Sequence, residues 1–155
     1  MPIIECKIVE VCVFRFEEDT PSYLLLHRSM TEPVYPGLWQ FVSGSIEDGE
    51  SAIEAARREL AEETALSPTA FWTVPFVNSF YDPARDAVNL SPLFAAQVKP
   101  GSIPKLSAEH DEFLWCGYAA ARRMLVWPGQ RNGLAMVHEY VARGSEAADR
   151  TRTTP

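Results

Sequence analysis

The chain has 155 residues, the size of one domain, and 46% of them are hydrophobic, which is enough for a sizeable core. A formal net charge of −7 argues against partners that are nucleic-acid polymers or anionic membranes. No apolar run approaches the length of a membrane span, and the start of the chain alternates with charges, unlike a secretory signal. We therefore expect a soluble, cytoplasmic domain with no membrane partner. The sequence gives no indication of an oligomeric state.

Residues 3–15 and 22–28 are rich in β-branched and aromatic side chains and predict two strands joined by a polar turn. Cys6 and Cys12 fall in the first of these strands, and the three cysteines lack metal-ligand spacing. We expect buried free thiols there, as in a reducing cytoplasm. Arg28 ends the second strand, where it either contacts a phosphate or is an exposed cation at a strand end.

A loop over residues 29–37, stiffened by two prolines, precedes a short predicted strand that leads to Gly44. Trp39 and Gln40 lie in this strand. An indole can stack on a base or pterin ring, and an amide can hydrogen-bond to its edge. Trp39 fits a core position equally well.

Residues 44–66 predict an acidic loop followed by one helix. Ser51 is a favourable N-cap, and Glu54, three residues later, completes a capping box. The helix has a narrow apolar stripe to bury, formed by Ile53, Ala56 and Leu60.

Glu59, Glu62 and Glu63 share another face of the same helix, because residues three and four apart are neighbours. Like charges at this spacing cost a few tenths of a kcal/mol in an isolated helix. A hard cation such as Mg²⁺ prefers oxygen ligands and would offset the repulsion. The alternative is a solvated acidic face, which is common on surface helices.

After the helix, residues 71–81 and 87–98 predict a β-hairpin, and a short strand follows that ends near Trp115. Phe76, Phe80 and Tyr81 are core or sheet-face residues by default, although one or two of them fit a ring-binding slot. Residues 117–126 predict a short helix. A terminal helix then buries Leu134, Val137 and either Tyr140 or Val141. We expect a domain over residues 1–144 and a disordered tail over 145–155, which lacks apolar content.

The spacing of Gly44, Glu50, Arg58-Glu59-Leu60 and Glu62-Glu63 resembles the signature of the Nudix hydrolases. Any six of these seven residues, each at roughly 7% usage, coincide by chance at about one position in ten million. The family pattern usually has Gly where this chain has Ala65. This departure affects the turn after the helix and not the chemistry, since Ala is less comfortable in a left-handed conformation.

The resemblance implies the Nudix fold, an α/β/α sandwich around a mixed, twisted sheet. The stretches LWQFVSGSIEDGES, AEHDEFLW and WPGQRN are similar to bacterial dihydroneopterin triphosphate pyrophosphohydrolases, also described as dATP pyrophosphohydrolases. That subfamily removes pyrophosphate from a pterin triphosphate with Mg²⁺ in folate synthesis. We expect the same cofactor here, with Mn²⁺ as a substitute, and a small polyphosphate substrate.

Cleavage of a phosphoanhydride moves charge onto the leaving phosphate, which divalent metals neutralise while they orient the attacking water. We assign Glu59 and Glu63 as the main metal ligands, completed by Glu62. The resemblance adds the Gly44 carbonyl and the Glu47 carboxylate. Two further residues are expected to position this cluster, Arg58 through ion pairs with the glutamates and Glu50 by fixing the loop against the helix.

A general base must take the proton of the attacking water. The resemblance gives this role, or an additional metal contact, to Glu109, which is followed by His110, an expected polar loop residue. Glu112 is the rival candidate, and a carboxylate that caps a turn is the alternative for Glu109. The expected substrate contacts are Arg28, Trp39, Gln40, Ser43 and Phe80.

These residues predict a Mg²⁺-dependent pyrophosphohydrolase of dihydroneopterin triphosphate or a dNTP. One alternative is a hydrolase of dinucleoside polyphosphates or nucleotide sugars. The other is a module that binds a nucleotide without cleaving it.

Overall fold

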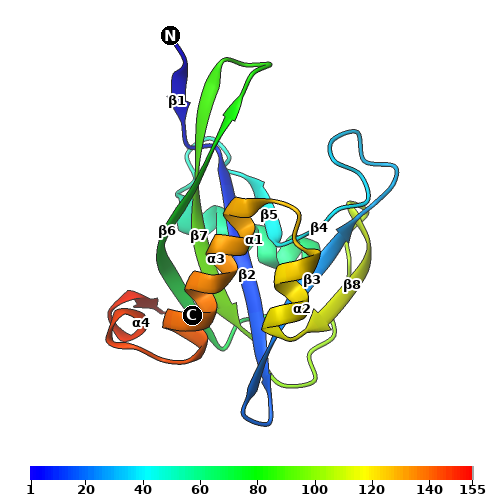
Figure 1. Ribbon diagram of the computed structural model, residues 1–155, viewed down its shortest axis with the longest axis vertical. Coiled ribbons are helices and arrows are strands. Elements are labelled where there is room, and N and C mark those ends of the chain that lie inside the picture. Colours follow the sequence, from blue (N-terminus) through cyan, green and yellow to red (C-terminus); the bar gives the residue numbers. More distant parts are fainter. Residues whose placement is uncertain (155) are drawn as a thin grey trace.

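The computed structural model describes residues 1–154 as a mixed, twisted sheet with helices on both faces (Figure 1). The central order of strands is β4-β3-β2-β7-β6-β9, and β1, β5 and β8 add to β7, β2 and β3. The pairs β1–β7 and β2–β7 are parallel and the others antiparallel. The strands are β1 (Ile3–Glu5), β2 (Ile8–Glu17), β3 (Thr20–Arg28), β4 (Trp39–Gln40), β5 (Val42–Ser45), β6 (Ala70–Asp82), β7 (Ala87–Gln97), β8 (His110–Cys116) and β9 (Arg152–Thr153).

Strand β2 shows why helices cover both faces of the sheet. Successive side chains of a strand point to opposite faces. Val9 and Val11 pack with helix α1 (Ala52–Thr64), whereas Cys12 and Phe14 pack with the C-terminal helices. Figure 1 shows α2 (Tyr118–Met124) and α3 (Pro128–Met136) in front of the sheet and α1 behind it. The predicted α/β/α sandwich is confirmed.

Helix α1 begins as the sequence predicts. The Glu54 amide donates to the Ser51 hydroxyl at 3.4 Å, and the Glu54 carboxylate accepts from the Ser51 amide at 2.8 Å. Ala56 and Leu60 are buried against the sheet, and Ile53 packs at the edge of the same cluster. The helix ends at Ala65, which is left-handed with φ of 54°.

The C-terminal segment differs from the prediction of a disordered tail. Ser145 caps helix α4 (Glu146–Thr151), and β9 pairs with β6, so the prediction is wrong for residues 146–153. The physical reason is that the edge of β6 offers unpaired backbone groups to residues 152–153, while Ala148 is buried. Residue 155, part of the same predicted tail, lies outside the described residues.

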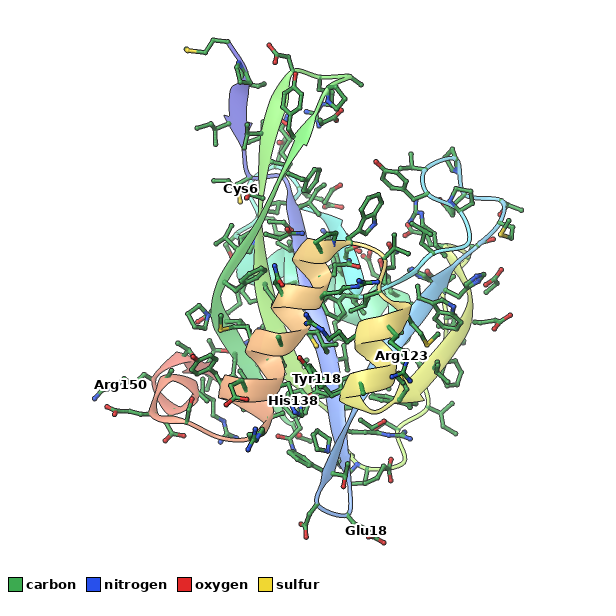
Figure 2. The ribbon with its side chains drawn as sticks, in the orientation of Figure 1. Cys6, Glu18, Tyr118, Arg123, His138 and Arg150 are labelled. Atoms are coloured by element: carbon green, nitrogen blue, oxygen red, sulfur yellow. The ribbon has the colours of Figure 1, made fainter. Side chains whose placement is uncertain are left out.

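The C-terminal helices confirm most of the expected core. Leu134, Val137 and Val141 are buried, whereas Tyr140 is exposed. The π-helix η1 (Val137–Ala142) continues α3 and carries His138, whose ring stacks on Tyr118 at 4.1 Å between centroids (Figure 2). No helix within residues 1–154 has both the length and the apolar character needed to cross a membrane.

The cysteines follow the prediction only in part. All three are free thiols, and Cys12 is buried in β2. Cys6 is exposed, contrary to expectation, because it lies between β1 and β2 and not within a strand (Figure 2).

Candidate active site

The acidic face of α1 lies against β5, which carries Gly44. A Cβ atom at Gly44 would be 1.9 Å from the carboxyl carbon of Glu59. No side chain tolerates such an approach, so only glycine lets the Glu59 carboxylate lie against this strand. The family-type spacing of these two residues therefore has a direct steric basis.

Arg58 holds the acidic groups together. Its guanidinium donates to Glu50 at 2.9 Å, to Glu59 at 2.8 Å and to Glu62 at 3.2 Å, and it also donates to the Ser45 carbonyl. Glu50 in turn accepts from the Glu47 amide at 3.0 Å. The expected ion pairs of Arg58 and the expected contact of Glu50 with the loop are both present.

Glu63 is the most unusual carboxylate of the helix. It is 2% exposed, and neither of its oxygens makes a hydrogen bond of normal geometry with the described residues. Burial, then the charges of Glu109 and Glu59, raise its pKa to about 9, and the Ser43 amide and Arg28 offset this only in part. A buried carboxylate without a donor is costly unless a cation pairs with it. The residues present therefore fit a divalent metal.

His110 is not the polar loop residue that the sequence predicts. It is buried as the first residue of β8, where the Gln40 amide donates to its Nε2 at 3.1 Å. Its Nδ1 lies 3.9 Å from a Glu63 oxygen. Burial, with the charge of Arg28, lowers its pKa to about 4, so the imidazole is neutral at neutral pH. It can serve this site as an orienting group or a ligand.

The two candidate bases lie in different places. Ligand atoms of Glu109, Glu63 and His110 all lie within 4.8 Å of one another. Glu112 instead forms a separate, largely exposed group with His27 and Asp111, where β8 pairs with β3. Glu109 is thus brought to the acidic cluster and Glu112 is not.

A cavity of about 430 Å³ opens in front of these carboxylates. Arg28 lines it from the end of β3, held by the Val34 carbonyl and by Glu32 at 3.2 Å. Glu62 does not line it, because its side chain is 59% exposed on the outer side of Arg58. We call this cavity the phosphate pocket; its lining is Ile8, Arg28, Val34, Tyr35, Gln40, Ser43, Gly44, Ser45, Glu47, Glu59 and Glu109.

A second cavity, of about 470 Å³, shares four lining residues with the phosphate pocket. It lies between the sheet and the start of α3. We call it the ring pocket; its lining is Ile8, Glu10, Tyr35, Gln40, Ser43, Asn78, Ser79, Phe80, Tyr81, Trp127, Pro128, Gly129 and Gln130.

The ring pocket contains three of the expected substrate contacts, Gln40, Ser43 and Phe80, but not Trp39. Neighbouring residues of a strand face opposite sides, so Gln40 and Trp39 cannot both point into it. Trp39 instead packs against the core, with its ring 5.0 Å from that of His27. Trp39 thus lines neither pocket and follows the core alternative that the sequence also allowed.

Several lining residues were missed from sequence. The aromatic groups are Tyr35 and Trp127, whose rings meet at 5.1 Å, and the polar ones include Glu10 and Gln130. The one available signal was Glu10, a carboxylate within the apolar run of β2.

The fold and site define an α/β protein with a carboxylate cluster at one of two adjoining, ligand-sized pockets. Residues 7–137 match the family model described as the NUDIX domain, so the chain belongs to the Nudix family.

Three relatives give the range of this similarity. A NUDIX hydrolase structure from Listeria monocytogenes superimposes with a TM-score of 0.71 at 28% identity, covering 90% of this chain and 93% of that one. An octanoyltransferase of Myxococcus xanthus is 33% identical over 132 residues, 81% of this chain and 34% of that protein. Dihydroneopterin triphosphate diphosphatase of Escherichia coli K12 is 39% identical over 62 residues, 40% of this chain and 39% of that protein. The matches to these two named proteins thus span little more than a third of their lengths.

Proposed function

We propose that this protein is a Mg²⁺-dependent pyrophosphohydrolase that cleaves a phosphoanhydride bond of a nucleoside-triphosphate-like substrate. The observation that carries the proposal is the buried Glu63 carboxylate. It makes no hydrogen bond of normal geometry with the described residues and lies with Glu59 and Glu109 beside a cavity that contains Arg28. Carboxylates together with a cationic group at one cavity fit a metal–polyphosphate complex.

Glu59 and Glu63 are the proposed principal ligands of the metal, with Glu109, the Gly44 carbonyl and Glu47 as further ligands. Glu62 is the outermost of the expected ligands because it is exposed and paired with Arg58. When bound, Mg²⁺, or Mn²⁺ in its place, neutralises phosphate charge and lowers the pKa of a bound water.

The protein's own groups supply position and proton transfer. Arg58 fixes the Glu59 carboxylate in one orientation through the hydrogen bond between them. Arg28 is placed to bind a phosphate of the substrate. Glu109 accepts the proton of the attacking water, whose oxygen forms a new bond to phosphorus as the bridging P–O bond breaks. The products are two phosphorylated fragments.

Dihydroneopterin triphosphate or a dNTP is the proposed substrate, with release of pyrophosphate. Support comes from the partial similarity to the E. coli dihydroneopterin triphosphate diphosphatase, and from a ring pocket that adjoins the phosphate pocket. A role in folate biosynthesis and a cytoplasmic location belong to the same proposal.

The test is pyrophosphate release from a panel of pterin, purine and pyrimidine triphosphates, with and without Mg²⁺. We expect Mg²⁺-dependent release with at least one of them and its loss in Glu59→Gln. Absence of release from every member, in wild type and variant alike, would refute the proposal.

The products separate the alternative functions. Inorganic pyrophosphate arises only from a triphosphate. A dinucleoside polyphosphate or a nucleotide sugar instead yields two phosphorylated fragments, each still attached to a nucleoside or a sugar. A non-catalytic module would bind the nucleotide and release no product at all.

A further inference from the structure

Glu10 is a buried acid that the proposed reaction does not use. It is 7% exposed near the start of β2 and lines the ring pocket. Alternation along β2 turns it away from the Val9 and Val11 side, toward the face that α3 covers. An acidic side chain at a core position requires a compensating partner.

The protein's own hydrogen-bond donors satisfy the Glu10 carboxylate only in part. The amide of Gln130, at the start of α3, donates to Glu10 Oε1 at 3.4 Å, which is a long hydrogen bond. Burial raises the pKa of Glu10, and the amides of Gln130 and Asn78 offset this only in part. Further hydrogen-bond donors would stabilise its carboxylate form.

Gln130 also lacks a hydrogen-bond donor. It is 4% exposed, and its Oε1 is a buried acceptor without a donor among residues 1–154. Two acceptors thus line one wall of the ring pocket: Gln130 Oε1, which has no donor, and the Glu10 carboxylate, which has a long hydrogen bond from the Gln130 amide. Such groups are usually satisfied in native proteins, and a ligand is one means of doing so.

The aromatic residues of the pocket indicate a flat ligand. Trp127 and Tyr35 line it, with Phe80 and Tyr81 from β6, and all four rings are partly exposed. A pocket of about 470 Å³ accommodates a bicyclic ring. Gln40 and Ser43 line both pockets, so a ring bound here lies next to the phosphate pocket.

The two acceptors, Glu10 and Gln130, indicate which hydrogen-bonding edge a ring ligand must present to them. Adenine and cytosine present one amino donor beside a ring acceptor, and thymine presents one N–H between two carbonyl acceptors. A 2-amino-4-oxo ring, as in guanine and in pterins, presents an N–H and an amino group side by side. Only this edge supplies two adjacent donors.

We propose that Glu10, assisted by Gln130, is the specificity-determining residue of the ring pocket and selects substrates with a 2-amino-4-oxo edge. This inference rests on the proposed function for the presence of a polyphosphate on the ring. It does not rest on that function for the recognition of the ring itself.

Ring recognition is tested with dGMP and dIMP, which differ by the 2-amino group and contain no phosphoanhydride bond. Affinities are measured by calorimetry with Mg²⁺ present. We expect wild type to prefer dGMP by about 10- to 100-fold, the usual discrimination of a bidentate contact. In Glu10→Gln this ratio should fall close to one, because the new amide N–H groups oppose the donors of the ring.

The matched control is Glu17→Gln, the same substitution at the exposed end of β2, which should keep the wild-type ratio. The Glu10→Gln protein should melt at or above the wild-type temperature, since it no longer buries an acid. Gln130→Met provides a second variant in which the ratio should also fall. Equal affinities in wild type, or an unchanged ratio in the folded Glu10 and Gln130 variants, would overturn the inference.

Hydrolysis separates this inference from the proposed function. The kcat/KM ratio of dGTP to dITP should follow the same pattern in wild type and in the three variants. If no triphosphate is cleaved while the dGMP preference still depends on Glu10, the proposed reaction fails and ring recognition stands. A parallel assay with dihydroneopterin triphosphate and dGTP separates the two sources of the ring, because the preferred ring has the higher kcat/KM in wild type. Both substrates should lose kcat/KM in Glu10→Gln.

Discussion

The phosphate pocket and the ring pocket adjoin, yet they are built in different ways. Most of the acidic groups of the first come from residues 44–63, on one strand, one loop and one helix. The second takes its groups from β2, β6 and the start of α3, so that Glu10 contacts Gln130 across 120 residues. The groups proposed to carry the reaction are therefore close together in the sequence, whereas the pocket proposed to bind the ring is assembled by the fold from distant segments.

The electrostatics of the two pockets differ as well. The phosphate pocket combines several carboxylates, and the pKa of Glu63 is raised first by burial and then by the charges of Glu109 and Glu59. In the ring pocket a single acid faces amides, and its pKa is raised mainly by burial. The first pocket thus needs a cation, and the second needs neutral donors.

Loss of a proposed metal ligand should have the largest effect of all substitutions. Glu59→Gln removes a charge next to Gly44, and several kcal/mol of transition-state stabilisation depend on the metal. We expect kcat to fall by about 10³-fold. Steady-state pyrophosphate release measures this effect. The comparison variant is Glu112→Gln, which lies outside both pockets and should remain within about twofold of wild type. A large loss in Glu112→Gln would assign the base to that residue instead.

The stability of the metal-free protein should fall as pH rises. The folded-state pKa of Glu63, about 9, exceeds its ordinary value of 4.5. Its contribution to stability is therefore present at low pH and is lost as pH rises toward 9. The pKa of His110 is shifted in the opposite direction, to about 4, and this shift changes the stability only below pH 6.5, the ordinary pKa of histidine. Between pH 7 and 9 we expect a loss of about 2–3 kcal/mol.

Urea unfolding in EDTA at pH 7 and 9 measures this loss, and Mg²⁺ should reduce it. Glu63→Gln is the control, because it removes the titrating group and should flatten the dependence. Burial also raises the pKa of Cys12, so a smaller slope should persist in that control. An equal slope in both proteins would contradict the assignment to Glu63.

Gly44→Ala should damage the phosphate pocket through its shape alone. The new Cβ would meet the Glu59 carboxylate at about 2 Å, which forces the carboxylate away from β5. We expect metal affinity or kcat to fall by about 10- to 100-fold, as for other residues that orient ligands. Titration of activity with Mg²⁺ measures it. Gly117→Ala, which meets no atom within 4 Å and has ordinary backbone angles, should leave both quantities unchanged.

Trp127→Ala should affect the ring pocket only. Stacking of a base on an aromatic side chain contributes about 1–3 kcal/mol, so KM should rise by about 10-fold while kcat stays nearly constant. Trp39→Ala gives the matched comparison, because that side chain packs against the core. It should lower the melting temperature and leave KM nearly unchanged. The reverse pattern in the two variants would restore Trp39 as the stacking residue.

The difference between the pockets also explains what the sequence could predict. The capping box of Ser51 and Glu54 and the acidic face of α1 depend on spacing along one helix, so they follow from local rules. The direction of Trp39 depends on how β4 pairs with β3, and a two-residue strand has no pattern that determines it. The burial of His110 and the role proposed for Glu10 depend on elements far away in the chain.

The smallest effect should come from the one departure from the family pattern. Ala65 ends α1 with φ of 54°, a conformation that glycine adopts without strain. Ala65→Gly should raise stability by about 0.5–1 kcal/mol, or the melting temperature by about 2 °C. Calorimetry measures the shift. Because Ala65 lines neither pocket, kcat, KM and the Mg²⁺ dependence should not change. A change in kcat would instead show that this turn positions Glu63. The residues that shape the phosphate pocket would then include the C-cap of α1 as well as the helix itself.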